Sequence, residues 1–195
     1  MSNTLLPPPD PRPVFDGPLE ALLVDLVQRT PELAPLPVQE ILVVGASAYG
    51  SAAASIRSLD DCAKNVVISG QRRRWELALR PPFFLDGDAT RRLGTLMHEL
   101  LHLDVTRPGQ LLACARHENR PHAEHEELAI DLAERWLEQG DLSLLAPLGH
   151  CGEVRMRQWK IRPIPDTVQR IFTDADIFHG TVHIMTHREN RTVWW

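Results

Sequence analysis

Residues 91–104 read RRLGTLMHELLHLD, and this stretch decides how the rest of the chain is interpreted. Its apolar side chains recur at the three- and four-residue spacing of an α-helix. Asp88, in the sequence GDAT, suits the N-cap position at the start of such a helix. The apolar positions cover much of the helix circumference: Leu93, Leu96, Met97, Leu100, Leu101 and Leu103. The pattern predicts a helix that is buried between a sheet and another helix.

The same stretch contains the sequence His98-Glu99-Leu100-Leu101-His102, an HExxH motif. Residues four apart on a helix lie on one face, so the imidazoles of His98 and His102 can bind one metal ion. Glu99 lies beside them, where its carboxylate can take a proton from water that a metal ion has made more acidic. Two imidazoles and a carboxylate without partners are costly to bury. The motif therefore predicts a zinc site rather than a pair of core histidines.

A zinc site needs a third protein ligand, and the sequence after the motif is rich in candidates. Residues 123–139 have the apolar spacing of a second helix, which Gly140 is expected to end in the C′ position. Glu127 and Asp131 lie one turn apart on this helix, so one carboxylate can bind the metal while the other accepts the N–H of a ligand imidazole. Further candidate ligands are close by in the sequence: His117, His122, Glu124, His125 and Glu126.

With HExxH on one helix and ExxxD on the next, this part of the chain resembles the gluzincin clan of zinc peptidases. The resemblance implies that the Zn²⁺ ligands are His98, His102 and Glu127. Glu99 is then the general base, and Asp131 orients a ligand imidazole. The resemblance also implies a zincin-like fold, with a small twisted sheet, an active-site helix and a second helix that closes the metal site. The implied activity is zinc-dependent hydrolysis of peptide bonds.

The helical phase of residues 123–139 leaves the third ligand open. If this helix is amphipathic with its apolar face near Leu132, His125 points inward and Glu127 points outward. A helix buried on both sides would remove the conflict. His125, or His122 at the start of the helix, is therefore the alternative third ligand, as in small phage-type metallopeptidases that resemble this HELLH context.

The other expected elements are grouped by type along the chain. Residues 1–18 contain six of the 16 prolines and are expected to form a flexible tail, and residues 19–28 have helical spacing. Short β-rich runs precede the motif and follow the second helix, at 38–44, 52–59, 66–69, 74–79, 154–161, 181–185 and 191–195. This segregation predicts an α+β domain over residues 19–148, with a C-terminal β-rich extension at 149–195 packed on the same domain.

Composition limits the class of protein. The chain has 195 residues, enough for one ordinary core, and a formal net charge of −5. It contains neither an apolar run of membrane-spanning length nor a signal-peptide pattern, and its three cysteines form no C-x-x-C pair. We therefore expect a cytoplasmic protein that does not act at a membrane. The basic run at 72–74 is accompanied by no groove-reading motif, so it is expected to be a solvated face rather than a contact for nucleic acid.

Together these patterns predict a zinc metallopeptidase that acts on a protein or peptide, with a dedicated intracellular protein as the expected substrate. The alternative is a catalytically inactive, zinc-stabilised binding or scaffold protein that keeps the ligands. A peptide substrate is expected to add as a strand to the sheet edge near the motif helix. Residues 75–79 are the candidate edge, although they can equally form an interior strand. No spacing selects the oxyanion donor among Tyr49, His150, His179, His183 and His187.

Overall fold

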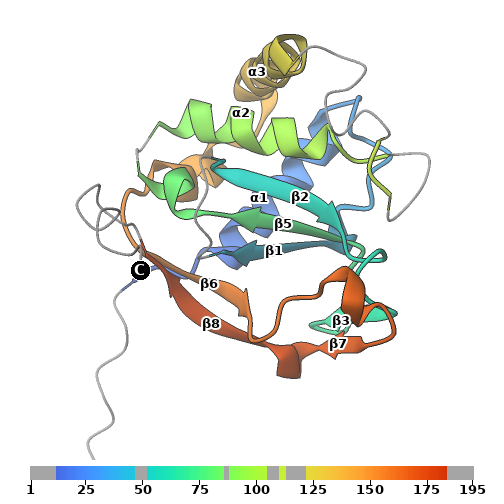
Figure 1. Ribbon diagram of the computed structural model, residues 1–195. Helices are drawn as coiled ribbons and strands as arrows, with labels where there is room; N and C mark the ends of the chain where they lie inside the picture. Colours follow the sequence, from blue (N-terminus) through green and yellow to red (C-terminus); the bar gives the residue numbers. More distant parts are fainter. Residues whose placement is uncertain (1–11, 47–51, 86–87, 105–109, 113–121, 184–195) are drawn as a thin grey trace, which may run out of the picture.

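The computed structural model describes residues 12–46, 52–85, 88–104, 110–112 and 122–183. The helices are α1 (Asp16–Arg29), α2 (Ala89–Leu100) and α3 (His122–Gln139). The strands are β1 (Ile41–Gly45), β2 (Ala54–Ser58), β3 (Asn65–Ile68), β4 (Gln71–Arg72), β5 (Trp75–Leu79), β6 (Val154–Trp159), β7 (Ile171–Thr173) and β8 (Ile177–Val182). This mixture of helices and small sheets confirms the α+β class (Figure 1).

The central sheet has the strand order β1-β5-β2. β1 runs parallel to β5, and β2 runs antiparallel to it. Every residue of β5 is buried, so the stretch 75–79 forms the interior strand and β2 forms the edge on the side of α2. In Figure 1, α2 lies along β2, and α3 lies on the far side of α2 from the sheet. The sheet and α3 therefore enclose the HExxH helix from two sides.

Helix α2 begins where the sequence predicts. The side chain of Asp88 accepts a hydrogen bond of 3.0 Å from the backbone N–H of Arg91, which caps the first turn. The apolar face of the helix, with Leu93, Leu96 and Leu100 fully buried, packs into the main core. That core also takes residues from α1, α3 and the sheet.

The β-rich C-terminal part packs on the central sheet. β6 and β8 pair antiparallel, and their residues Val154, Met156 and Val182 are fully buried in the main core. The close approach requires Gly45 at the end of β1, because a Cβ there would come within 2.4 Å of Val182 Cγ2. β7 pairs parallel with β3 in a second small sheet. The described part of residues 149–195 thus shares its core with residues 19–148.

The proline-rich tail is shorter than the predicted range 1–18. Phe15 is buried and packs edge-to-face against Phe84, with ring centroids 5.3 Å apart. Asp16, the first residue of α1, is also buried, and its carboxylate accepts a 2.8 Å hydrogen bond from the backbone N–H of Arg157. Residues 12–18 therefore belong to the folded domain, and residues 1–11 lie outside the described part of the chain.

Two further expectations are corrected by packing. Gly140 follows α3, but it does not have the positive φ of a left-handed C′ residue; instead, a Cβ there would lie 2.2 Å from the Trp136 ring. The basic run at 72–74 is not a uniformly solvated face, because Arg73 is 5% exposed and donates hydrogen bonds to the carbonyl oxygens of Gln39 and Ile41.

The last predicted strands are shifted or lie outside the described residues. β8 begins at Ile177, four residues before the predicted run at 181–185, and the run at 191–195 is not described. Within the described residues, none of the helices is both long enough and apolar enough to cross a membrane.

Candidate metal centre

The side chains of His98, His102 and His125 come together between α2 and α3. One ring nitrogen from each lies within 4.8 Å of the other two. The centroid of the His125 ring is 4.6 Å from those of both His98 and His102. His102 and His125 are buried and His98 is partly buried. These three imidazoles could hold a metal ion.

Local backbone structure determines the position of each of the three candidate ligands. His98 lies in the last turn of α2. His102 lies just beyond it, where its N–H donates to the carbonyl of Glu99 and the chain tightens from α-helical to three-residue spacing. The carbonyl of His102 in turn accepts from the N–H of Leu112. Nε2 of His125 lies 3.3 Å from the backbone oxygen of His98, so a proton on Nε2 would leave Nδ1 with the lone pair for a metal.

Glu127 and Asp131 do not join this cluster. The buried face of α3 contains His125, Ala129 and Leu132, and Glu127 is about 200° around the helix from His125 at 100° per residue. Glu127 is exposed. Asp131 is 64% exposed and its carboxylate pairs with Arg135 at 3.2 Å, one turn along the same helix. The structure follows the helical phase and brings His125, rather than Glu127, next to His98 and His102.

The other sequence candidates near α3 separate into two groups. Glu124 and Glu126 are exposed on α3. His117 lies outside the described residues, and the side chain of His122 is likewise not described. Within the described residues, the group that could bind a metal is therefore the triad from α2, the turn after it and α3.

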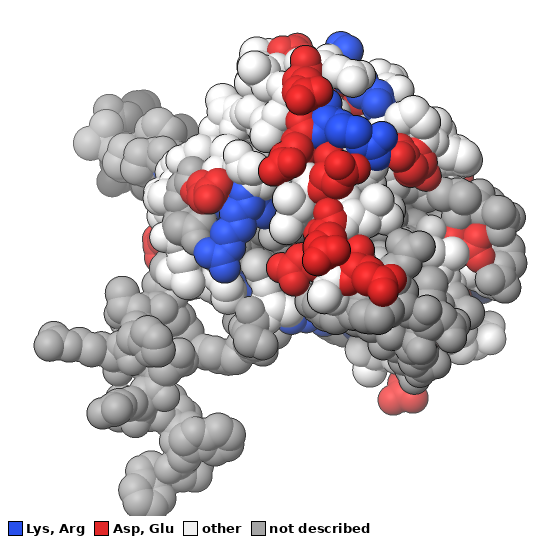
Figure 2. Space-filling model, turned by 90° about the horizontal axis from the view of Figure 1, so that it is seen from above, with Lys and Arg blue, Asp and Glu red and all other residues white. Residues whose placement is uncertain are grey.

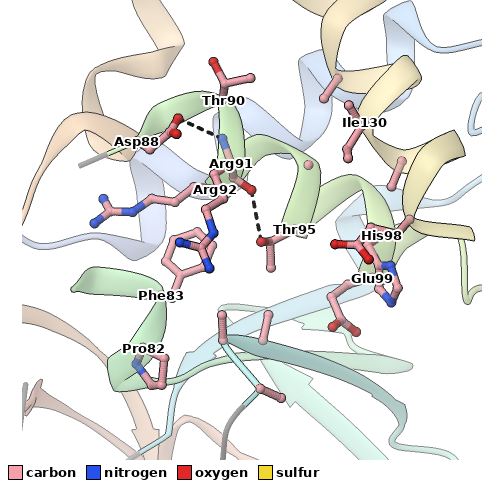
Figure 3. A pocket seen from close by; sticks show the side chains of 17 residues that line it. Pro82, Phe83, Asp88, Thr90, Arg91, Arg92, Thr95, His98, Glu99 and Ile130 are labelled. Carbon is pink, nitrogen blue, oxygen red and sulfur yellow. Dashed lines mark hydrogen bonds between the residues drawn. The ribbon is translucent and has the colours of Figure 1, made fainter. Parts of the chain in front are cut away.

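Glu99 follows His98 on α2, and its side chain is buried. Its side chain extends from α2 toward β2, and Oε2 accepts a 2.8 Å hydrogen bond from the backbone N–H of Ile56 (Figure 3). Burial raises the pKa of Glu99 to about 7, although the Ile56 hydrogen bond and the positive charge of Arg80 act in the opposite direction. The HExxH carboxylate is thus held at the sheet edge, and Glu99 lines the same groove as His98.

The chemistry of this donor set fits a zinc ion. Zn²⁺ accepts neutral imidazole nitrogens at about 2.0–2.1 Å and, in catalytic sites, takes three protein ligands with one position left open. Ring nitrogens that already lie within 4.8 Å of one another need only small ring rotations to share one ion. Within the part of the chain that the structure describes, the cluster consists of imidazole nitrogens alone, the donor set of three-histidine zinc centres.

A groove leads away from the triad along α2. It has a volume of about 680 Å³ and is lined by residues from α2, α3, the start of β2 and the turn that contains Phe83. His98 and Glu99 line one end. Figure 3 shows Ile130 extending from α3 toward α2 at the side of this space. The candidate metal centre is therefore reached from an open groove.

The outer surface of α3 is acidic. Figure 2, which looks down on this helix, shows Asp and Glu side chains in a line across the face. The exposed acidic residues of the helix are Glu124, Glu126, Glu127, Asp131, Glu134 and Glu138. Such a cluster produces a negative potential that favours cations close to the groove.

The described candidates for an oxyanion donor are engaged elsewhere. His179 lies on β8, where Nε2 is 2.7 Å from the buried Asp16 carboxylate. His183 lies 2.9 Å from Glu153, and His150 Nε2 lies 3.4 Å from the Glu153 carbonyl oxygen. None of these three side chains lines the groove. Tyr49 and His187 lie outside the described residues.

The chain was compared with protein-family models, with characterised proteins and with solved structures, and no match was found in any of the three. Function is therefore inferred from the site itself.

Proposed function

We propose that this protein is a zinc-dependent peptidase with a zincin-like arrangement, in which His98, His102 and His125 hold the ion. One observation carries the proposal: buried Glu99 of the HExxH motif and His98 of the histidine triad line the same end of an open groove. A three-histidine cluster alone would suit a structural metal. A buried carboxylate next to it, facing a space large enough for a substrate, favours hydrolysis.

The ion would supply Lewis-acid chemistry, which polarises the scissile carbonyl and lowers the pKa of water. Glu99 takes a proton from the attacking water as the water oxygen bonds to the carbonyl carbon. The same carboxylate passes that proton to the nitrogen of the leaving amine as the C–N bond breaks. The Ile56 N–H keeps the carboxylate oriented toward the strand edge during both transfers.

The substrate is proposed to bind as an extended segment along β2. This strand is the sheet edge nearest Glu99, so it replaces residues 75–79 as the candidate edge; because Glu99 occupies the Ile56 N–H, a peptide would pair with the other outward backbone groups of β2. A protein or peptide in the cytoplasm is the proposed substrate, and this rests on the sequence patterns described above. An inactive zinc-stabilised scaffold would keep the triad but would not need the Glu99 carboxylate.

The proposal is tested with zinc-loaded protein and a peptide mixture prepared from a whole-cell digest, with new peptide termini identified by mass spectrometry. We expect cleavage by the parent protein and by Glu127→Gln, the matched control on the exposed face of α3. Glu99→Gln should bind zinc and not cleave. Zinc binding without any cleavage by the parent protein would favour the scaffold instead.

A further inference from the structure

The outer edge of strand β8 is open to a further strand. In Figure 1, β8 lies outermost, with β6 between it and the central sheet. Within the described residues β8 pairs with β6 alone, so its other edge has no strand beside it. We infer that this edge pairs antiparallel with β8 of a second copy of the chain, with His179 of both copies at the two-fold axis. The metal centre lies on the opposite side of the central sheet, so the inference does not depend on the proposed function.

The backbone groups that face this edge follow from the pairing of β8 with β6. In an antiparallel pair, every second residue directs both its N–H and its C=O away from the partner strand. On β6, Arg155 and Arg157 do so, because both donate their N–H groups to the segment 13–16. The residues of β8 that lie opposite these two point outward as well. By this alternation, the outward residues of β8 are Ile177, His179 and Thr181.

Some of the outward backbone groups are already bonded within the chain. The N–H of Ile177 donates to the oxygen of Asp174, and the oxygen of Thr181 accepts a 2.9 Å hydrogen bond from Gln158 Nε2. Within the described residues, the other outward groups have no hydrogen-bond partner. They are the oxygen of Ile177, the N–H and the oxygen of His179, and the N–H of Thr181.

These free groups form a set that is complementary to itself. When two β8 strands pair antiparallel about His179, each His179 N–H meets the oxygen of the other His179. Each Thr181 N–H meets the oxygen of Ile177 of the second copy. The two groups that are bonded within the chain, the Ile177 N–H and the Thr181 oxygen, face each other across the same interface. The distribution of free and bonded groups therefore has the two-fold symmetry that an isologous dimer requires.

The side chains of β8 also allow the strand to meet its own copy. Exposed edge strands are usually protected against pairing by charged side chains or by proline. Residues 177–182 read IFHGTV and contain no Lys, Arg, Asp, Glu or Pro, so like charges do not face one another in the two-fold arrangement. His179 lies 2.7 Å from the Asp16 carboxylate, which would compensate a charge on the imidazole. Phe178 is 43% exposed and would lie opposite Gly180 of the second copy, where the interface covers it.

Sedimentation velocity of the full chain tests for the second copy. A single strand pair buries little surface compared with an obligate dimer, so association should appear between about 1 and 200 µM. Over this range the apparent mass should rise from that of one chain, 22.0 kDa, toward twice that value. A parent protein that stays monomeric at the highest concentration would overturn the inference and would leave the edge to a segment of another protein.

Two substitutions test whether β8 is the interface. Thr181→Pro removes an outward N–H that the β6 pairing does not use, so the dissociation constant of the dimer should rise at least about 10-fold. Thr181→Val keeps this N–H and is the matched control, with an expected change below about threefold. Phe178→Lys places a charge near the same charge of the second copy and should also weaken association at least about 10-fold. Thermal unfolding and zinc content show whether each variant is folded, and undiminished association of folded variants would overturn the inference.

Cysteine substitutions test the register about His179. In a background with Cys114→Ser and Cys151→Ser, the double variant Ile177→Cys/Thr181→Cys places the two positions opposite each other across the interface, with Cα atoms about 5.5 Å apart. This separation permits a disulfide, whereas the same two positions within one strand are about 13 Å apart. Oxidation should give a covalent dimer of the double variant on a non-reducing gel, and each single variant should remain a monomer. A double variant that does not cross-link, or single variants that cross-link equally, would overturn this register.

Discussion

The backbone N–H of Ile56 donates a hydrogen bond of 2.8 Å to Oε2 of Glu99, which joins the edge strand of the central sheet to the HExxH carboxylate. The donor is a main-chain group, so its position is fixed by the pairing of β2 with β5, in which Ile56 lies opposite Leu77. A side chain at position 99 that can still accept this bond should keep its orientation. The contact therefore allows the charge of Glu99 to be removed without disturbing its place.

The first prediction concerns Glu99→Gln. The amide oxygen of glutamine can accept the Ile56 hydrogen bond, but the side chain cannot take a proton from water, so turnover should fall by about 10²- to 10⁴-fold. Zinc content should be unchanged. The variant should be at least as stable as the parent protein at neutral pH, because burial disfavours a charged carboxylate at this position. Metal analysis, peptide cleavage and thermal unfolding check the three parts, and undiminished cleavage would contradict the role of Glu99.

The second prediction concerns the ligand set. Each of His98→Ala, His102→Ala and His125→Ala should weaken zinc binding by at least about 100-fold, because each removes one of three nitrogen ligands. Glu127→Ala should bind zinc as tightly as the parent protein, since Glu127 is exposed on the far side of α3. Competition with a chromophoric chelator measures the affinities. Loss of zinc from Glu127→Ala, with retention in His125→Ala, would reverse the assignment.

The sequence predicted those features that depend on local signals. Asp88 and the apolar spacing after it locate α2, because capping and helical periodicity act over a few residues. The phase of the second helix likewise indicated that His125 faces inward, and the structure agrees. The family resemblance instead favoured Glu127. The motif behind it specifies only the spacing of residues along the chain, and it does not specify the direction in which their side chains point.

Other features depend on contacts that no local pattern records. The interior place of β5 follows from its parallel pairing with β1, whose residues lie more than 30 positions earlier in the chain. The folded start of the domain at Phe15 depends on its contact with Phe84, far along the sequence. The Ile56 contact to Glu99 uses a backbone donor, which has no sequence signature at all.

The third prediction concerns metal removal. A ligand that binds only the folded state stabilises it by RT ln(1 + [L]/Kd), or about 4 kcal/mol when free zinc is 1,000 times Kd. Addition of EDTA should therefore lower the unfolding temperature of the parent protein, and the shift should depend on the zinc concentration before chelation. His125→Ala should show little response to either treatment. Equal responses in the two proteins would mean that zinc acts somewhere other than the triad.

The last prediction concerns Glu76, the fully buried second residue of β5. Its carboxylate accepts hydrogen bonds from Arg57 on β2, at 2.7 and 2.9 Å, and from Arg162 and the Trp159 indole, each at 2.6 Å. Burial by itself would raise the pKa of this carboxyl, but the hydrogen bonds and charges of the two arginines outweigh it and hold the pKa below the ordinary value of 4.5. The network joins the C-terminal part to the central sheet.

Glu76→Gln should destabilise the protein by about 3–5 kcal/mol at neutral pH, because two arginines lose the buried charge that compensates them. Since the pKa is lower in the folded state, the stabilisation from ionised Glu76 is complete above about pH 4.5 and is lost as the pH falls through the folded-state pKa. Denaturant unfolding measures the free energy of unfolding of the parent protein and of Glu76→Gln. The difference between these two free energies should become smaller below about pH 4.5. Glu32→Gln, which breaks the exposed pair with Arg135, is the control and should cost no more than about 1 kcal/mol. If the difference in the free energy of unfolding between the parent protein and Glu76→Gln stays constant as the pH falls, the ionised carboxylate does not provide the stabilisation.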